Sequence, residues 1–62
     1  MRQEDLYVNC HVFPEAKATF TLEVEYFSSM LKIDITGRGG NTQSIILNDT
    51  DITMLEDLLR MR

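Results

Sequence analysis

The chain has 62 residues, of which 44% are apolar and 26% are charged, and its net charge is −4. This composition is that of a globular protein, and no apolar run approaches the ~20 residues of a membrane-spanning helix. The acidic balance argues against general affinity for nucleic acids, because phosphate binding depends on clustered lysine and arginine.

The length predicts a single domain, residues 1–62, near the lower size limit for independent folding. The N-terminus carries acids where a signal peptide has a basic start and an apolar core. Cys10 is the only cysteine, so no internal disulfide can form. These features favour the cytoplasm, and the lack of a disulfide makes a partner chain an expected source of stability.

The first predicted strand covers residues 5–13, where apolar and polar side chains alternate. Residues 14–17 should form a turn, because they begin with a proline that cannot donate a ladder hydrogen bond. A turn at this point pairs the first strand with the residues that follow Thr19. It places Leu6 opposite Tyr26.

The second and third strands are predicted within residues 19–36, where alternation continues on both sides of Ser28 and Ser29. A two-residue turn at these serines places Tyr26 opposite Leu31 and gathers the apolar side chains on one face. A slip of one residue would scatter them over both faces. Two serines lack the glycine or asparagine that tight turns favour, so a slightly longer connection is the alternative.

Residues 37–44, GRGGNTQS, are expected to form a flexible hairpin loop. A phosphate-binding loop is disfavoured, because the segment lacks the lysine and serine or threonine of a P-loop and leads into a short strand instead of opening a helix. A short fourth strand is expected over residues 44–47. Its Ile45 and Leu47 should point inward and its Ile46 outward.

Residues 48–62 predict a helix that Asn48 caps, with Asp51 completing a capping box. The predicted fold class is therefore α+β. It is a small antiparallel three- to four-stranded β-meander with one C-terminal helix packed on one face, in the order β-β-β-(β)-α.

The inner face of this sheet is expected to form the core, with an apolar helix stripe lying across it. The sheet residues of this core are Leu6, Val8, Cys10, Val12, Phe20, Leu22, Val24, Tyr26, Leu31, Ile33 and Ile35. The helix residues are Ile52, Leu55, Leu58 and Leu59.

Catalysis is not expected. Cys10 and His11 are neighbours in a predicted strand, so their side chains should point to opposite faces and cannot form a nucleophile–base pair. No spacing of ligands predicts a metal site, and no cofactor is expected. Glu23 and Asp34 should lie directly opposite one another, but on an open surface rather than in a pocket.

The outer sheet face is the predicted partner-binding surface, because an apolar cluster rimmed by carboxylates is typical of protein interfaces. Its candidate residues are Tyr7, Glu23, Glu25, Phe27, Met30 and Asp34. A solvated face with a few scattered apolar residues is the alternative.

The function predicted from these features is a non-catalytic, acidic protein-interaction module, most concretely a small inhibitor or adaptor that docks on a larger protein with a basic surface. An inhibitor of a host nucleic-acid-handling defence enzyme, encoded by a phage or mobile element, fits the size and charge by analogy. The alternative is a homo-oligomeric transcriptional or nucleic-acid accessory protein that uses Arg2, Lys17 and Arg38. A homodimer is expected through the outer sheet face, a sheet edge or the side of the helix that carries Met54 and Met61.

Overall fold

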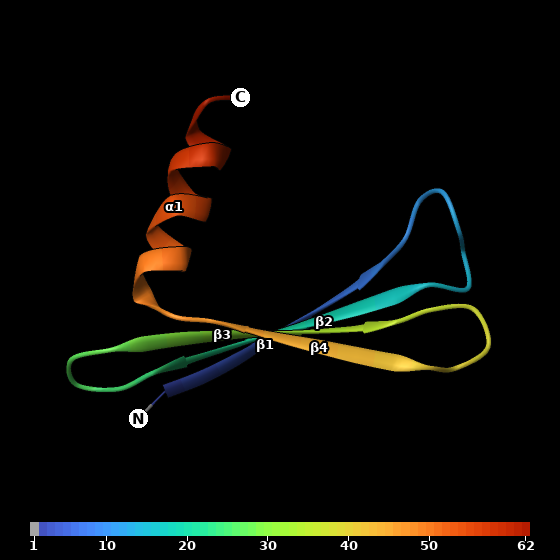
Figure 1. Cartoon of the computed structure of the whole chain (residues 1–62), viewed down its shortest axis with the longest axis horizontal. Coiled ribbons are helices and arrows are strands. Elements are labelled where there is room, and N and C mark those ends of the chain that lie inside the picture. The colour runs from blue at the N-terminus through green and yellow to red at the C-terminus, as the bar shows by residue number, and fades with distance from the viewer. Residues whose placement is uncertain (1) are drawn as a thin grey trace.

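The computed structural model describes residues 2–62 and contains one antiparallel sheet followed by one helix (Figure 1). The strands are β1 (Arg2–Asn9), β2 (Lys17–Val24), β3 (Ser29–Thr36) and β4 (Thr42–Leu47), and the helix is α1 (Asp49–Arg60). The strand order β1-β2-β3-β4 is that of a meander. The predicted fold class is confirmed, and the fourth strand begins two residues earlier than predicted.

The first hairpin differs from its predicted register. β1 ends at Asn9, and residues 10–16 form a loop closed by a 3.0 Å hydrogen bond from the Cys10 amide to the Ala16 carbonyl. Leu6 lies opposite Phe20 instead of Tyr26, a shift of six residues. The loop is wider than expected because it contains its own turn, in which the Ala16 amide donates to the Phe13 carbonyl at 2.9 Å.

The second hairpin shows a similar shift. Residues 25–28 form its loop, which the Glu25 amide closes by donating to the Ser28 carbonyl at 2.8 Å. Leu31 lies opposite Leu22 instead of Tyr26, a shift of four residues. The prediction of a two-residue turn was therefore wrong, and the longer connection, which was the alternative, is present. Two serines do not favour the positive φ that a tight hairpin turn requires.

Both shifts are even numbers of residues, so each side chain that remains in a strand keeps its predicted face. Val24 and Ile33 lie on the same side of the sheet, as predicted, and both are half-buried. We call this side the apolar face. Its apolar residues are Leu6 and Val8 on β1, Ala18, Phe20, Leu22 and Val24 on β2, Leu31, Ile33 and Ile35 on β3, and Ile45 and Leu47 on β4. Arg2, Glu4, Ser29 and Gln43 also lie on this side, at its margins.

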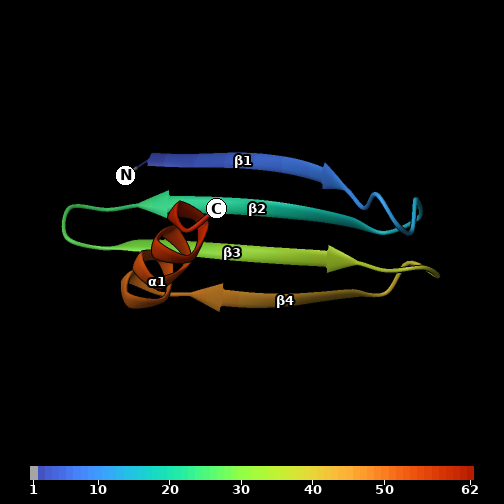
Figure 2. The same ribbon diagram turned by 90° about the horizontal axis from the view of Figure 1, so that it is seen from above.

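The start of α1 is fixed by side-chain hydrogen bonds. The Asp51 amide donates to Asn48 Oδ1 at 3.0 Å and the Asn48 amide donates to Asp51 Oδ2 at 3.3 Å, which confirms the predicted capping box. The Ser29 amide also donates to Asp49 Oδ1 at 2.6 Å and ties the first turn to β3. The helix packs on β3 and β4 at one end of the sheet (Figure 2).

Beyond its first turns, α1 rises steeply from the sheet instead of lying across it (Figure 1). Ile52 and Leu55 are half-buried, whereas Leu58 and Leu59 remain 63% and 55% exposed. No side chain within residues 2–62 is fully buried. The prediction that the helix stripe closes over a core was therefore wrong, because the helix is held at its first turn and diverges from the sheet along its length.

Three further residues assigned to the core lie outside the sheet. Cys10 is in the first loop, where its Sγ accepts hydrogen bonds from the amides of Val12 at 3.4 Å and Phe13 at 3.2 Å. Val12 and Tyr26 are exposed in the two loops that close the first and second hairpins. The wider loops take these residues out of the ladder, so their alternation with polar neighbours does not reflect a strand.

Candidate functional site

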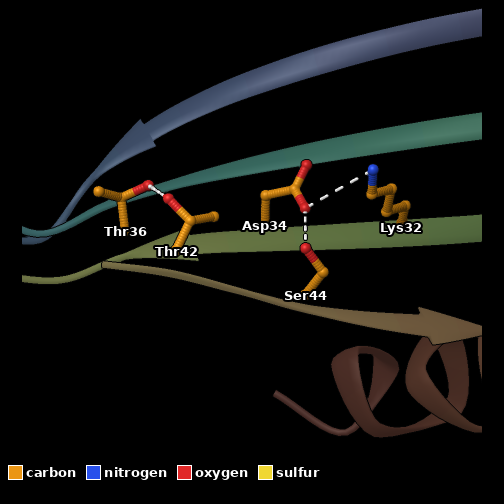
Figure 3. Close-up of polar contacts among 5 residues, drawn as sticks. All are labelled: Lys32, Asp34, Thr36, Thr42 and Ser44. Atoms are coloured by element: carbon orange, nitrogen blue, oxygen red, sulfur yellow. Dashed lines mark hydrogen bonds and ion pairs between the residues drawn. The ribbon is translucent and has the colours of Figure 1, made fainter. Parts of the chain in front are cut away.

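The face of the sheet opposite α1 is polar and carries its own contacts (Figure 3). Asp34 accepts a hydrogen bond from the Ser44 hydroxyl and lies 3.9 Å from Lys32 Nζ. Farther along the same strands, the hydroxyls of Thr36 and Thr42 are 3.0 Å apart and share a hydrogen bond. These contacts link β3 to β4, so the Asp34 carboxylate is engaged within the sheet.

The six predicted partner-binding residues divide into two groups. Tyr7 and Asp34 both lie opposite Thr19, in one row across β1, β2 and β3. Glu23 lies opposite Met30 and not, as predicted, opposite Asp34. It is four residues along β2 from Thr19, which separates it from the row of Tyr7 and Asp34 by about 13 Å. The prediction that all six residues form one cluster with Tyr7 was therefore wrong, because the registers of both hairpins are shifted.

The second group forms a compact site where the second hairpin closes. Glu23, Glu25, Ser28 and Met30 line a small surface pocket of about 160 Å³. Phe27 follows in the loop, next to Tyr26. We call the set Glu23, Glu25, Tyr26, Phe27 and Met30 the acidic tip.

The two aromatic side chains of the acidic tip are almost free of the rest of the chain. Tyr26 is 95% exposed and Phe27 is 99% exposed. Their ring centroids are 6.4 Å apart, with the rings tilted by 44°, which is within the range of a favourable aromatic pair. The pair therefore presents a large apolar surface to solvent without support from the sheet.

The carboxylates of the acidic tip are not neutralised within the described chain. The ion pairs found in residues 2–62 are Arg2–Glu4, Lys32–Asp34, Arg60–Glu56 and Arg60–Asp57, so neither Glu23 nor Glu25 belongs to one. Two uncompensated carboxylates next to exposed aromatic rings favour contact with a basic surface. Of the three basic residues considered for nucleic acid, Arg2 is already paired with Glu4.

Residues considered for chemistry lie apart from the acidic tip. Cys10 and His11 are in the loop between β1 and β2, at the opposite end of the sheet (Figure 2). Among residues 2–62, no three potential metal ligands of the His, Cys, Asp or Glu type are grouped together. The 37–41 segment is a hairpin loop, as predicted, with positive φ at Gly39 and Gly40.

Within the described residues, α1 is too short and too polar to cross a membrane. Comparison of the chain with protein-family models, curated proteins and solved structures finds no match.

Sequence reasoning missed Tyr26 as a surface residue, because its alternation with Val24 placed it in the core. The signal that could have found it is the weak turn chemistry of Ser28 and Ser29. A loop at residues 25–28, instead of a turn at the two serines, places Tyr26 and Phe27 outside the strands.

Proposed function

We propose that the chain is a non-catalytic, acidic protein-interaction module that docks through its acidic tip on a basic surface of a larger protein. The observation that supports this function most directly is the nearly complete exposure of Tyr26 and Phe27 beside the unpaired carboxylates of Glu23 and Glu25.

The aromatic pair supplies the affinity in this proposal. Tyrosine is enriched among interface residues whose truncation costs about 2 kcal/mol or more, and such residues act by entering desolvated pockets. Tyr26 and Phe27 share one short loop, so both rings can enter one pocket of a partner. The hydrogen bond from the Glu25 amide to the Ser28 carbonyl, 2.8 Å long, restrains the loop before binding.

The carboxylates supply steering and orientation. Opposite charges across an interface accelerate encounter and disfavour wrong partners more than they add affinity. Glu23 and Glu25 border the pocket next to Met30 and so lie at the rim of the apolar contact. A basic partner surface is therefore the complement that this site selects.

In its most concrete form, the module is a small cytoplasmic inhibitor or adaptor of a nucleic-acid-handling enzyme, such as one encoded by a phage or mobile element against a host defence. The net charge of −4 on 62 residues supports this form, because an acidic chain can occupy a basic surface that otherwise holds nucleic acid. This step rests on analogy of size and charge.

The test begins with capture from the native cell or host lysate on the immobilised chain, followed by mass spectrometry. Wild type is compared with the Tyr26→Ala/Phe27→Ala variant and with Phe13→Ala, whose exposed aromatic ring lies in the loop at the opposite end of the sheet. The specific protein should be retained by wild type and Phe13→Ala and lost with the double variant. Loss of about 2 kcal/mol or more corresponds to at least roughly 30-fold weaker binding.

The electrostatic part is tested on the purified partner by measuring the dissociation constant at several salt concentrations. Glu25→Lys should weaken binding at low salt and flatten its salt dependence. Glu15→Lys makes the same change of net charge in the opposite loop and is the matched control. If Glu25→Lys and Glu15→Lys weaken binding equally, the carboxylates of the acidic tip act only through the net charge of the chain. If the Tyr26→Ala/Phe27→Ala variant captures the partner as well as Phe13→Ala does, the proposed site is refuted.

A further inference from the structure

The sheet has two open edges, because β1 and β4 each pair with only one neighbouring strand. β1 carries the charged residues Arg2, Glu4 and Asp5, and Glu4 lies on the apolar face, opposite Leu22. A charge that points inward on an edge strand is a feature by which natural sheets resist pairing with other chains. β4 (Thr42–Leu47) has no charged residue and no proline, and its register with β3 runs without a bulge. The β4 edge therefore lacks the protection that β1 has.

One loop hydrogen bond shows which backbone groups of β4 are free. The Gly37 amide donates to the Asn41 carbonyl at 3.0 Å, and this pair is one step beyond the end of the β3–β4 register. In an antiparallel ladder, pairs that exchange hydrogen bonds alternate with pairs that do not. The β4 residues that bond to β3 are therefore Gln43, Ile45 and Leu47. The residues whose amides and carbonyls point away from β3 are Thr42, Ser44 and Ile46.

These outward-pointing groups are accessible. Within residues 2–62, only β3 and α1 contact β4. α1 begins after Asn48, beyond the end of β4, and projects over β3 towards β2 (Figure 2). Ile45 and Ile46 are 53% and 59% exposed, whereas most side chains of the inner strands β2 and β3 are half-buried. β4 therefore presents a row of unpaired backbone groups that another strand can reach.

We propose that two copies of this chain pair through their β4 edges, antiparallel and about a two-fold axis that passes between their Ser44 residues. In this register Ser44 lies opposite Ser44 of the second copy, and Thr42 lies opposite Ile46. Every outward-pointing amide and carbonyl of β4 is then hydrogen-bonded in both copies. A shift by two residues in either direction leaves the groups at one end of the edge without a partner strand. The inference does not depend on the acidic tip, which lies at the β2–β3 hairpin.

The side chains of β4 suit a strand of the same sequence. Opposite residues of an antiparallel pair point to the same side of the sheet, so two β-branched residues meet on the polar side and Ile45 meets Gln43 on the apolar side. Like charges that face one another across a strand pair are unfavourable, and β4 has none. The nearest charged residues on β3, Lys32 and Asp34, form an ion pair of 3.9 Å. A second copy therefore completes the edge without opposing like charges.

Sedimentation equilibrium on wild type, Ser44→Pro and Asp5→Pro tests the contact. The hydrogen bond from the Cys10 amide to the Ala16 carbonyl sets the same alternation in β1, so the Asp5 amide also points outward. Each proline therefore removes an outward amide from an edge strand, where no ladder hydrogen bond is lost. Ser44→Pro should weaken the dimer at least tenfold, because the symmetry removes the same hydrogen bond twice. Asp5→Pro should associate as wild type does.

The contact is short, as in transient interfaces, so the concentration series extends to ~1 mM. Wild type should approach twice the 7.2 kDa chain mass at the upper end of this series. Ser44→Ala removes the hydroxyl that contacts Asp34 but keeps the amide, and it should associate as wild type does. A wild type that stays monomeric at ~1 mM overturns the proposal and leaves the β4 edge to a strand of another protein. Equal weakening by Ser44→Pro and either control also overturns it.

Amide hydrogen exchange, followed by NMR on wild type, locates the contact without any substitution. The outward amides of β4 should exchange more slowly at ~1 mM than at ~50 μM, as the fraction of dimer rises. The outward amides of β1, such as that of Asp5, should exchange at the same rate at both concentrations. Slower exchange on β1, or unchanged exchange on β4 while the mass doubles, overturns the β4 contact.

Discussion

The capping box of α1 is a sharp test of how this helix is held. Asn48→Ala removes the Oδ1 acceptor that satisfies the Asp51 amide at 3.0 Å. Loss of such a cap costs about 1 kcal/mol. A 12-residue helix is marginal by itself, and the exposure of Leu58 and Leu59 shows that the second half of α1 receives little support from its own sheet. The free energy lost with the cap should therefore appear as local unfolding of α1.

A free-energy change of about 1 kcal/mol corresponds to a roughly fivefold change in an equilibrium constant. Amide hydrogen exchange, followed by NMR at one fixed protein concentration, reports the opening of α1 and of the sheet separately. Asn48→Ala should accelerate exchange of the α1 amides about fivefold, in line with the cost of the lost cap. The β2 and β3 amides should change less, because their ladder does not involve Asn48.

Thr50→Ala is the control in the same helical turn. None of the side-chain hydrogen bonds found in residues 2–62 involves Thr50, and alanine has the higher helix propensity. This variant should leave exchange unchanged or slow it slightly. If Asn48→Ala also leaves exchange of α1 unchanged, packing of α1 on a sheet, and not the cap, determines its stability, and the reasoning from the capping box fails.

Two further substitutions test the sheet. Gly40→Ala should lower the free energy of unfolding by about 1 kcal/mol in a urea titration, because Gly40 has φ +86° and alanine is strained there. Gly37→Ala is its control, because the φ of Gly37 is outside the left-handed region and an added Cβ would meet no atom within 4 Å. Ser44→Ala removes the hydrogen bond to Asp34 and should cost about 1 kcal/mol or less, because the pair is exposed. A cost above about 3 kcal/mol would show that this contact is buried in solution, for example beneath a partner on the polar face.

The alternation of side chains was sufficient to predict the number of strands and the face of each residue in the ladder, but not the strand bounds or registers. The first strand lies at Arg2–Asn9 instead of residues 5–13, and the second ends at Val24. Periodicity of two assigns each residue to a face, and a register shift of four or six residues leaves that assignment unchanged. Leu6 therefore reaches the apolar face whether it pairs with Phe20 or with Tyr26. The register depends on loop geometry, which Pro14 and the serine pair specify only weakly.

The position of α1 on the sheet could not be predicted from local sequence patterns. The cap at Asn48 and the start of α1 followed from local chemistry, which a short segment carries in full. The helix ends at Arg60, two residues before the predicted end. The first turn of α1 is tied to β3 by the hydrogen bond from the Ser29 amide to Asp49, and this contact joins segments 20 residues apart, which no local pattern predicts. The acidic tip was found only in part for a similar reason, since its aromatic pair depends on where the second hairpin turns.

The acidic tip and the apolar face lie on different parts of the molecule. Glu23 and Met30 lie on the polar side of the sheet, opposite one another on β2 and β3. Tyr26 and Phe27 are in the loop of the second hairpin and are almost fully exposed. A partner that binds the acidic tip therefore needs no contact with the apolar face, so the test of the acidic tip does not depend on what covers that face.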